Sequence, residues 1–169
     1  AIRCFEPFAE DPHRYARALQ LLPAGCTDEV VELLTDLRRL ADRQGDRDEC
    51  AFDALQNSEV VAGAERYYRT MVQADERSWN VRDGHMADTL DRLVDHADGS
   101  GAPAKAIVWA HNTHVGDARA TDMAAAGLTN LGQIARERHA GDGVALVGFG
   151  GYAGNVIAGR RWGAPWERM

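Results

Sequence analysis

Two short apolar runs, KAIVWA at residues 105–110 and GVALVGFG at residues 143–150, constrain the possible folds most strongly. Each run is continuous rather than alternating, which is typical of a strand buried on both faces of a parallel sheet. Between them, LTNLGQIARERHA (residues 128–140) predicts a helix. The order strand, loop, helix, strand predicts a βαβ unit with a right-handed crossover. GNVIAGR, residues 154–160, is a candidate for a further strand.

The first hundred residues have helical periodicity instead. Asp11 is a candidate N-cap with Pro12 at the first helical position, and Thr27 begins a second helix with acidic residues in its first turn. A polar turn at residues 74–78 precedes the last helix of this part, with Ser78 or Asn80 as its N-cap. The predicted helices cover residues 11–22, 27–44, 49–73 and 79–97.

These patterns predict one α/β domain over residues 1–169, with a helical portion at 1–98 and a βαβ portion at 105–169. The net charge of −7 is spread over interspersed acidic and basic residues, so neither nucleic acid nor a membrane surface is expected as a partner. No apolar run approaches the roughly 18 residues of a membrane span. The first residue is alanine and the chain stops at RRWGAPWERM, so we expect an excerpt of a longer protein.

The three cysteines, Cys4, Cys26 and Cys50, are odd in number and lack a CxxC spacing. They therefore predict neither a disulfide framework nor a zinc site, and a reducing cytoplasm is the expected location.

The segment HNTHVGD follows the run KAIVWA directly, which places His111 at the carboxyl end of the first predicted strand. Ligands of open α/β sheets bind at this edge. His111, Asn112, His114 and Asp117 are groups that can bind a ligand or transfer a proton, so they are the candidate site. A satisfied loop histidine is the structural alternative for each imidazole. Two histidines three apart, with Asp117, could also share a metal ion, but neither the spacing nor the glutamate of HExxH is present.

Arg82 and Asp83 are predicted in the first turn of the helix over 79–97. There an aspartate commonly offsets the helix dipole, so capping is the favoured interpretation of Asp83. Arg82 is a candidate clamp for a carboxylate or an oxyanion. The sequence has neither a GxSxG elbow nor a phosphate loop, so a serine hydrolase and a nucleotide site are disfavoured.

The segments WNVRDGHM, WAHNTHVGD, GFGGYAG and RRWGAPWERM closely resemble the erythromycin esterase-like family, over almost the whole chain. The resemblance implies a three-layer α/β/α fold with a mainly parallel sheet and large helical excursions. It also implies metal-independent hydrolysis of an ester or macrolide lactone by activated water, without a cofactor. His111 and His114 carry over as residues of the active-site cleft, where they would orient the substrate or stabilise developing charge.

The family's principal base, with its partner glutamate and arginine, belongs to an amino-terminal half that has no counterpart in residues 1–169. The resemblance therefore implies a partial domain whose partners are a small-molecule ester and that missing half, and which has little or no activity alone. Two alternatives remain open: a binding module that has lost the chemistry, and a metal-dependent hydrolase using the HxxH pair.

Overall fold

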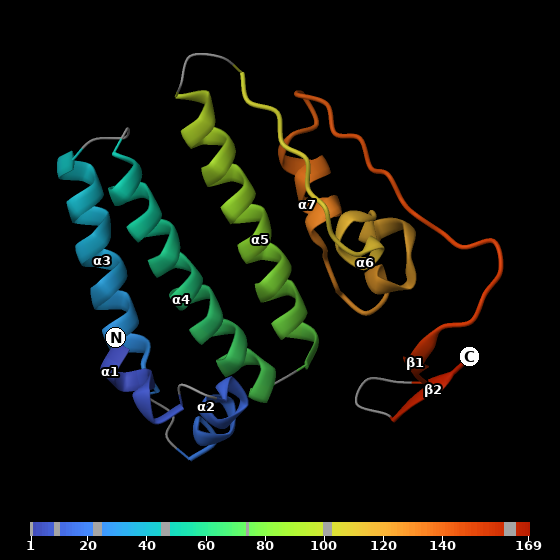
Figure 1. The fold of residues 1–169 in the computed structure, drawn as a ribbon, viewed down its shortest axis with the longest axis horizontal. Coiled ribbons are helices and arrows are strands. Elements are labelled where there is room, and N and C mark those ends of the chain that lie inside the picture. The colour runs from blue at the N-terminus through green and yellow to red at the C-terminus, as the bar shows by residue number, and fades with distance from the viewer. Residues whose placement is uncertain are drawn as a thin grey trace.

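The computed structural model describes residues 2–8, 11–21, 25–44, 48–73, 75–99, 103–160 and 165–169, and most of them are helical. Three long helices lie side by side, and α7 lies beyond the last of them (Figure 1). The short α1, η1 and α2 lie at one end of the long helices. The helices are α1 (Ile2–Phe5), η1 (Glu6–Phe8), α2 (Pro12–Ala18), α3 (Thr27–Gln44), α4 (Glu49–Gln73), α5 (Asp75–Asp98), α6 (Asn112–Val115), η2 (Ala118–Ala120), η3 (Asp122–Ala124) and α7 (Leu131–Arg138).

The predicted starts of the first three helices are confirmed, although α2 already ends at Ala18, short of its predicted range of 11–22. Asp11 caps α2, because its carboxylate accepts a hydrogen bond from the backbone N–H of His13, and Pro12 takes the first helical position. α3 begins at Thr27 as predicted, and α4 has the predicted bounds. None of the helices in the described ranges is long and apolar enough to cross a membrane.

The predicted start of α5 is wrong. The helix begins at Asp75, so the expected turn at 75–78 is already helical and Ser78 and Asn80 lie inside the helix. Arg82 and Asp83 are consequently two turns away from the helix start, where the helix dipole acts weakly on a side chain. Compensation of the helix dipole therefore does not explain why an aspartate lies at position 83.

The predicted three-layer α/β/α fold with a mainly parallel sheet is also wrong. In the described ranges the strands are β1 (Ile157–Gly159) and β2 (Trp166–Arg168), which pair antiparallel with Ile157 opposite Arg168. β1 lies within the run predicted as a further strand. The βαβ unit is reduced to its helix, α7, because residues 103–110 and 143–150 have no regular secondary structure. A strand needs a hydrogen-bonded neighbour, and apolarity predicts only that a segment will be buried.

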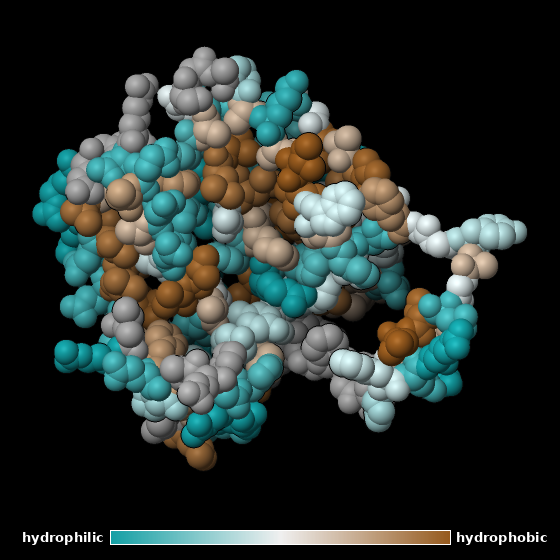
Figure 2. All heavy atoms as spheres, in the orientation of Figure 1, coloured by the Kyte–Doolittle hydropathy of each residue, from teal (hydrophilic) through white to brown (hydrophobic). Residues whose placement is uncertain are grey.

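The two apolar runs are instead largely exposed. Ile107 and Trp109 are 94% and 84% exposed, and Phe149 is 66% exposed. The ends of the runs nevertheless meet: the rings of Trp109 and Phe149 are 5.5 Å apart, and the amide of Asn112 exchanges two hydrogen bonds with the backbone of Phe149. In Figure 2 apolar atoms gather in the upper part of the view, in the region where Figure 1 shows α5 and the extended segment that follows it. We call this surface the apolar face; its exposed members are Ile107, Val108, Trp109, Val147 and Phe149.

The expectation of unpaired cysteines is corrected as well. Cys4 and Cys26 form a disulfide that ties α1 to the start of α3, whereas Cys50 is free and exposed. Cys26 belongs to a buried cluster with Tyr15 and Val30. Because disulfides persist mainly in oxidising compartments, the argument for a reducing cytoplasm loses its support.

Gly63 allows α4 to approach α5 at His85. A Cβ atom added at Gly63 would lie 2.8–3.0 Å from three atoms of the His85 ring. We expect Gly63→Ala to lower the free energy of unfolding by about 1–2 kcal/mol, because overpacking outweighs the gain in helix propensity. In a His85→Ala background the same change should be neutral or stabilising. Urea denaturation of all four proteins tests this, and equal losses in both backgrounds would contradict it.

The titration of His85 predicts a pH dependence of stability. Burial lowers the pKa of His85 below 6.5, and the positive charge of Arg92 acts in the same direction. The unfolded chain then binds more protons than the folded one, so the free energy of unfolding should decrease as the pH falls below about 6.5. Urea denaturation at about pH 7.5 and 5.5 measures the decrease, and His85→Gln should make it smaller. An unchanged slope in His85→Gln would contradict the assignment.

Candidate functional site

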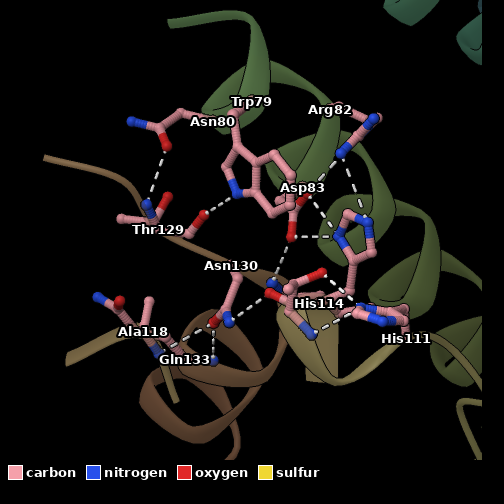
Figure 3. A network of polar contacts seen from close by, with 12 residues as sticks. Trp79, Asn80, Arg82, Asp83, His111, His114, Ala118, Thr129, Asn130 and Gln133 are labelled. Atoms are coloured by element: carbon pink, nitrogen blue, oxygen red, sulfur yellow. Dashed lines mark hydrogen bonds and ion pairs between the residues drawn. The ribbon is translucent and has the colours of Figure 1, made fainter. Parts of the chain in front are cut away.

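The candidate site lies where α5, α6 and the start of α7 meet (Figure 3). α5 contributes Trp79, Arg82 and Asp83 on one side, and α6 contributes His114. Three hydrogen bonds fix the loop before α7 to α5: Trp79 donates to the carbonyl of Thr129, Asn80 donates to the carbonyl of Gly127, and the N–H of Thr129 donates to the side chain of Asn80. The site is therefore held by helices and by the loop that is tied to them.

Asp83 is the centre of the site. Its side chain is fully buried, and its carboxylate accepts a hydrogen bond of 3.0 Å from the backbone N–H of Leu131, the first residue of α7. The first N–H groups of a helix lack partners within the helix, so Asp83 satisfies one of them from a neighbouring helix. The same carboxylate lies 2.9 and 3.0 Å from Nδ1 of His114. Asp83 thus joins α5, α6 and α7.

The imidazole of His114 has a defined orientation and tautomer. A carboxylate accepts hydrogen bonds, so the proton of neutral His114 must be on Nδ1. The ring stacks on Trp79 with 4.8 Å between centroids and 3° between planes. Nε2 then carries the lone pair, and its neighbour is the NH2 nitrogen of Arg82 at 3.4 Å. Aspartate and indole together fix a histidine whose outer nitrogen can accept a proton.

Arg82 presents a positive charge beside His114. Its guanidinium lies 4.7 Å from the centre of the Trp79 ring, and its Nε is 3.9 Å from the Asp83 carboxylate. That Nε is the one buried side-chain nitrogen or oxygen without a hydrogen-bond partner in the described part of the chain. The side chain is 38% exposed, so the guanidinium also reaches solvent. An arginine in this position can bind an oxyanion.

His111 has the opposite tautomer. It is the N-cap of α6, and its Nδ1 accepts a hydrogen bond of 3.3 Å from the backbone N–H of Thr113. The Thr113 hydroxyl also lies 3.0 Å from this nitrogen. The neutral ring therefore carries its proton on Nε2, which is a donor. The HxxH segment, expected as a loop, is a short helix that offers one acceptor nitrogen from His114 and one donor from His111.

The other two predicted residues have structural partners. Asn112 binds the backbone of Phe149 through its side-chain amide, so it joins α6 to the extended segment at residues 143–150. Asp117 caps η2 and pairs with Arg119 at 2.7 Å and with Arg136 at 3.7 Å. The hydrogen bond from Arg119 lowers the pKa of Asp117 to about 2. Of the five residues proposed from sequence, Arg82 and His114 contact each other directly.

Sequence reasoning missed Asp83 and Trp79 as members of the site. A signal was present, because Asp83 lies on the same helical stripe as Met86, Leu90 and Val94. An aspartate in a buried stripe needs a partner from another element. Within the described ranges, no group of three or more histidine, cysteine, aspartate or glutamate side chains could hold a metal ion.

Comparison with known proteins agrees with the resemblance inferred from the motifs. The family described as Erythromycin esterase matches residues 1–169, which is the whole chain. No solved structure matches the chain.

Proposed function

Because the chain belongs to the erythromycin esterase family, and hydrolase activity is what this family suggests, we propose that it forms one wall of a site that cleaves a carboxylic ester or a macrolide lactone. The observation that carries the proposal is the buried Asp83 that holds His114 with Nε2 beside the guanidinium of Arg82. The proposed substrate is a small-molecule ester.

In this mechanism Arg82 and His111 act on the ester carbonyl. Attack of water on the carbonyl carbon places negative charge on the carbonyl oxygen, and donors that face that oxygen stabilise the charge. Arg82 supplies a cation, and His111 supplies the N–H of Nε2. The indole of Trp79 lies under Arg82 and stabilises its positive charge through a cation–π contact.

His114 exchanges protons in the same mechanism. The principal base takes the first proton of the attacking water, and Nε2 can accept the second proton from the tetrahedral intermediate. His114 then gives this proton to the leaving alkoxide when the carbon–oxygen bond breaks, and Asp83 stabilises the imidazolium that forms in between. Arg82 must move from Nε2 toward the carbonyl oxygen for this step. The principal base that activates the water, with its glutamate and arginine, is assigned to the amino-terminal half that the family resemblance implies.

The apolar face is the proposed docking surface for that half. Its exposed side chains belong to extended segments whose ends meet next to the site, at Trp109, Asn112 and Phe149. Strands added to these segments would pair their backbone groups and bury their side chains. Esterase activity is then expected only of a longer polypeptide that contains both parts.

Hydrolysis of an ester panel by such a longer polypeptide tests the proposal. We expect His114→Gln to lower kcat at least a hundredfold without altering the fold, because a general acid–base group typically contributes this much. The matched control is His139→Gln at the C-cap of α7, since His139 is paired with Asp91 and does not belong to the site. Full activity in His114→Gln would refute the proposal. Loss of activity with a chelator would favour a metal-dependent site, and ligand binding without turnover would favour a binding module.

A further inference from the structure

A cavity lies away from His114, and its lining residues belong to α1, η1, α2 and α4. Figure 1 shows where these helices lie. Its volume is about 260 Å³, which is ample for one aromatic ring, since cavities of about 150 Å³ already hold benzene. The walls are almost entirely apolar and rich in aromatic rings. The lining residues are Phe5, Phe8, Tyr15, Val61, Ala64, Glu65 and Tyr68.

Glu65 is the one charged residue of this lining, and it is 5% exposed. Three donors hold its carboxylate: the hydroxyl of Tyr15 at 2.9 Å, the hydroxyl of Thr27 at 3.2 Å and the guanidinium of Arg69. All three reach the same oxygen, Oε1. No hydrogen bond between described residues reaches the second oxygen, Oε2. Since Oε2 is also absent from the fully buried atoms that lack a partner, it keeps some exposed surface, although the side chain is only 6% exposed. Because Glu65 lines the cavity, the cavity is where Oε2 can meet a donor.

The charge of the cavity selects among possible ligands. Arg69 forms an ion pair with Glu65, so the negative charge of the carboxylate is already compensated. An anion would meet Oε2 with repulsion, and a cation would meet both the attraction of Glu65 and the repulsion of Arg69. A neutral donor satisfies Oε2 without burying a second charge.

The aromatic walls are fixed by the fold. Tyr15 packs edge-to-face against Phe5 and Phe8, with centroids 5.1 and 5.4 Å apart, and its hydroxyl accepts a hydrogen bond from the backbone N–H of Cys26. The Cys4–Cys26 disulfide lies next to Phe5 and ties α1, which carries that ring, to the start of α3. The cavity is therefore preformed, as small-molecule sites usually are.

We propose that this cavity binds a small neutral aromatic molecule that donates one hydrogen bond, such as an aryl alcohol, to Oε2 of Glu65. This site is separate from the proposed esterase site and does not depend on it. A larger side chain at position 64 would fill the cavity, because Ala64 lines it. Ala64 is also exposed on α4, so the substitution does not disturb a buried position.

Titration of the chain with three matched probes, followed by amide chemical shifts, tests the proposal. Benzyl alcohol should bind saturably in the millimolar range expected of a fragment, with shifts centred on residues 61–68. Benzyl methyl ether, which lacks the donor, should bind at least about fivefold more weakly, because a hydrogen bond to a charged group is lost. Benzylamine, a cation, should bind no more tightly than the alcohol.

Ala64→Leu should abolish the shifts by filling the cavity. The matched control is Ala97→Leu, an exposed alanine on α5 that does not line the cavity and should leave binding unchanged. Equal affinity for alcohol and ether, tighter binding of the amine, retained binding in Ala64→Leu or the absence of saturable shifts would each overturn the proposal.

Discussion

Asp83→Ala is expected to lower the free energy of unfolding by about 3–5 kcal/mol, because it removes a buried carboxylate that serves two other helices. The backbone N–H of Leu131 and Nδ1–H of His114 would both lose their acceptor. A buried donor without a partner costs about 1–3 kcal/mol, and hydrogen bonds to charged groups are the stronger ones. The midpoint of urea denaturation at neutral pH measures the loss.

Asp88→Ala is the matched control for this experiment. Asp88 lies on the same helix, but its side chain is 52% exposed and its ion pair with Arg138 is at the surface. Such pairs contribute roughly 0–1 kcal/mol, so the control should unfold close to the parent chain. If Asp83→Ala were no less stable than Asp88→Ala, Asp83 could not be the group that joins α5, α6 and α7.

Gly132→Ala is expected to be the second most damaging substitution. A Cβ atom at this position would lie 2.6 Å from the carbonyl carbon of Val115 and closer still to the carbonyl oxygens of Val115 and Gly116. These are backbone atoms, so no side-chain rotation relieves the overlap, and α7 must move away from α6. We expect a net loss of about 2–3 kcal/mol in the free energy of unfolding, although alanine alone would favour the helix.

Gly84→Ala is the matched comparison, at a helical glycine where an added methyl group meets no other atom. Gly84 is on α5, and nothing lies within 4 Å of a Cβ atom added there. This variant should be more stable by roughly 0.5–1 kcal/mol through helix propensity alone. Thermal denaturation of both variants measures which of them is the more stable. Similar effects of the two substitutions would contradict the close approach of α7 and α6.

The helices of the first hundred residues were predictable because their signals are local. Asp11 is the N-cap of α2 and Pro12 takes its first position, as expected for these residue types. The apolar stripe of α3 can be recognised from residues that are close in the sequence. The start of α5 was not predictable from Ser78, since a serine can cap a helix or continue it, and the preceding residues decide which.

The sheet and the centre of the site depend on contacts between distant segments. An apolar run such as KAIVWA indicates a tendency to be buried. A strand also needs a neighbouring segment with which it can form hydrogen bonds, and the run does not identify that neighbour. Likewise, His114 was found because histidines at a segment end are conspicuous, whereas its partner Asp83 lies 31 residues earlier on another helix. Arg82 was proposed from its chemistry, and its position over Trp79 follows from the helix on which both lie.

The protonation of His114 tests the central claim most directly, because the proposed chemistry requires a lone pair on Nε2. A long-range ¹H–¹⁵N spectrum, recorded at a pH where the ring is neutral, distinguishes the two tautomers. The arrangement with Asp83 predicts protonated Nδ1 in the parent chain, and loss of that preference in Asp83→Ala, which leaves Nδ1 without an acceptor. A proton on Nε2 of His114 in the parent chain would contradict the account.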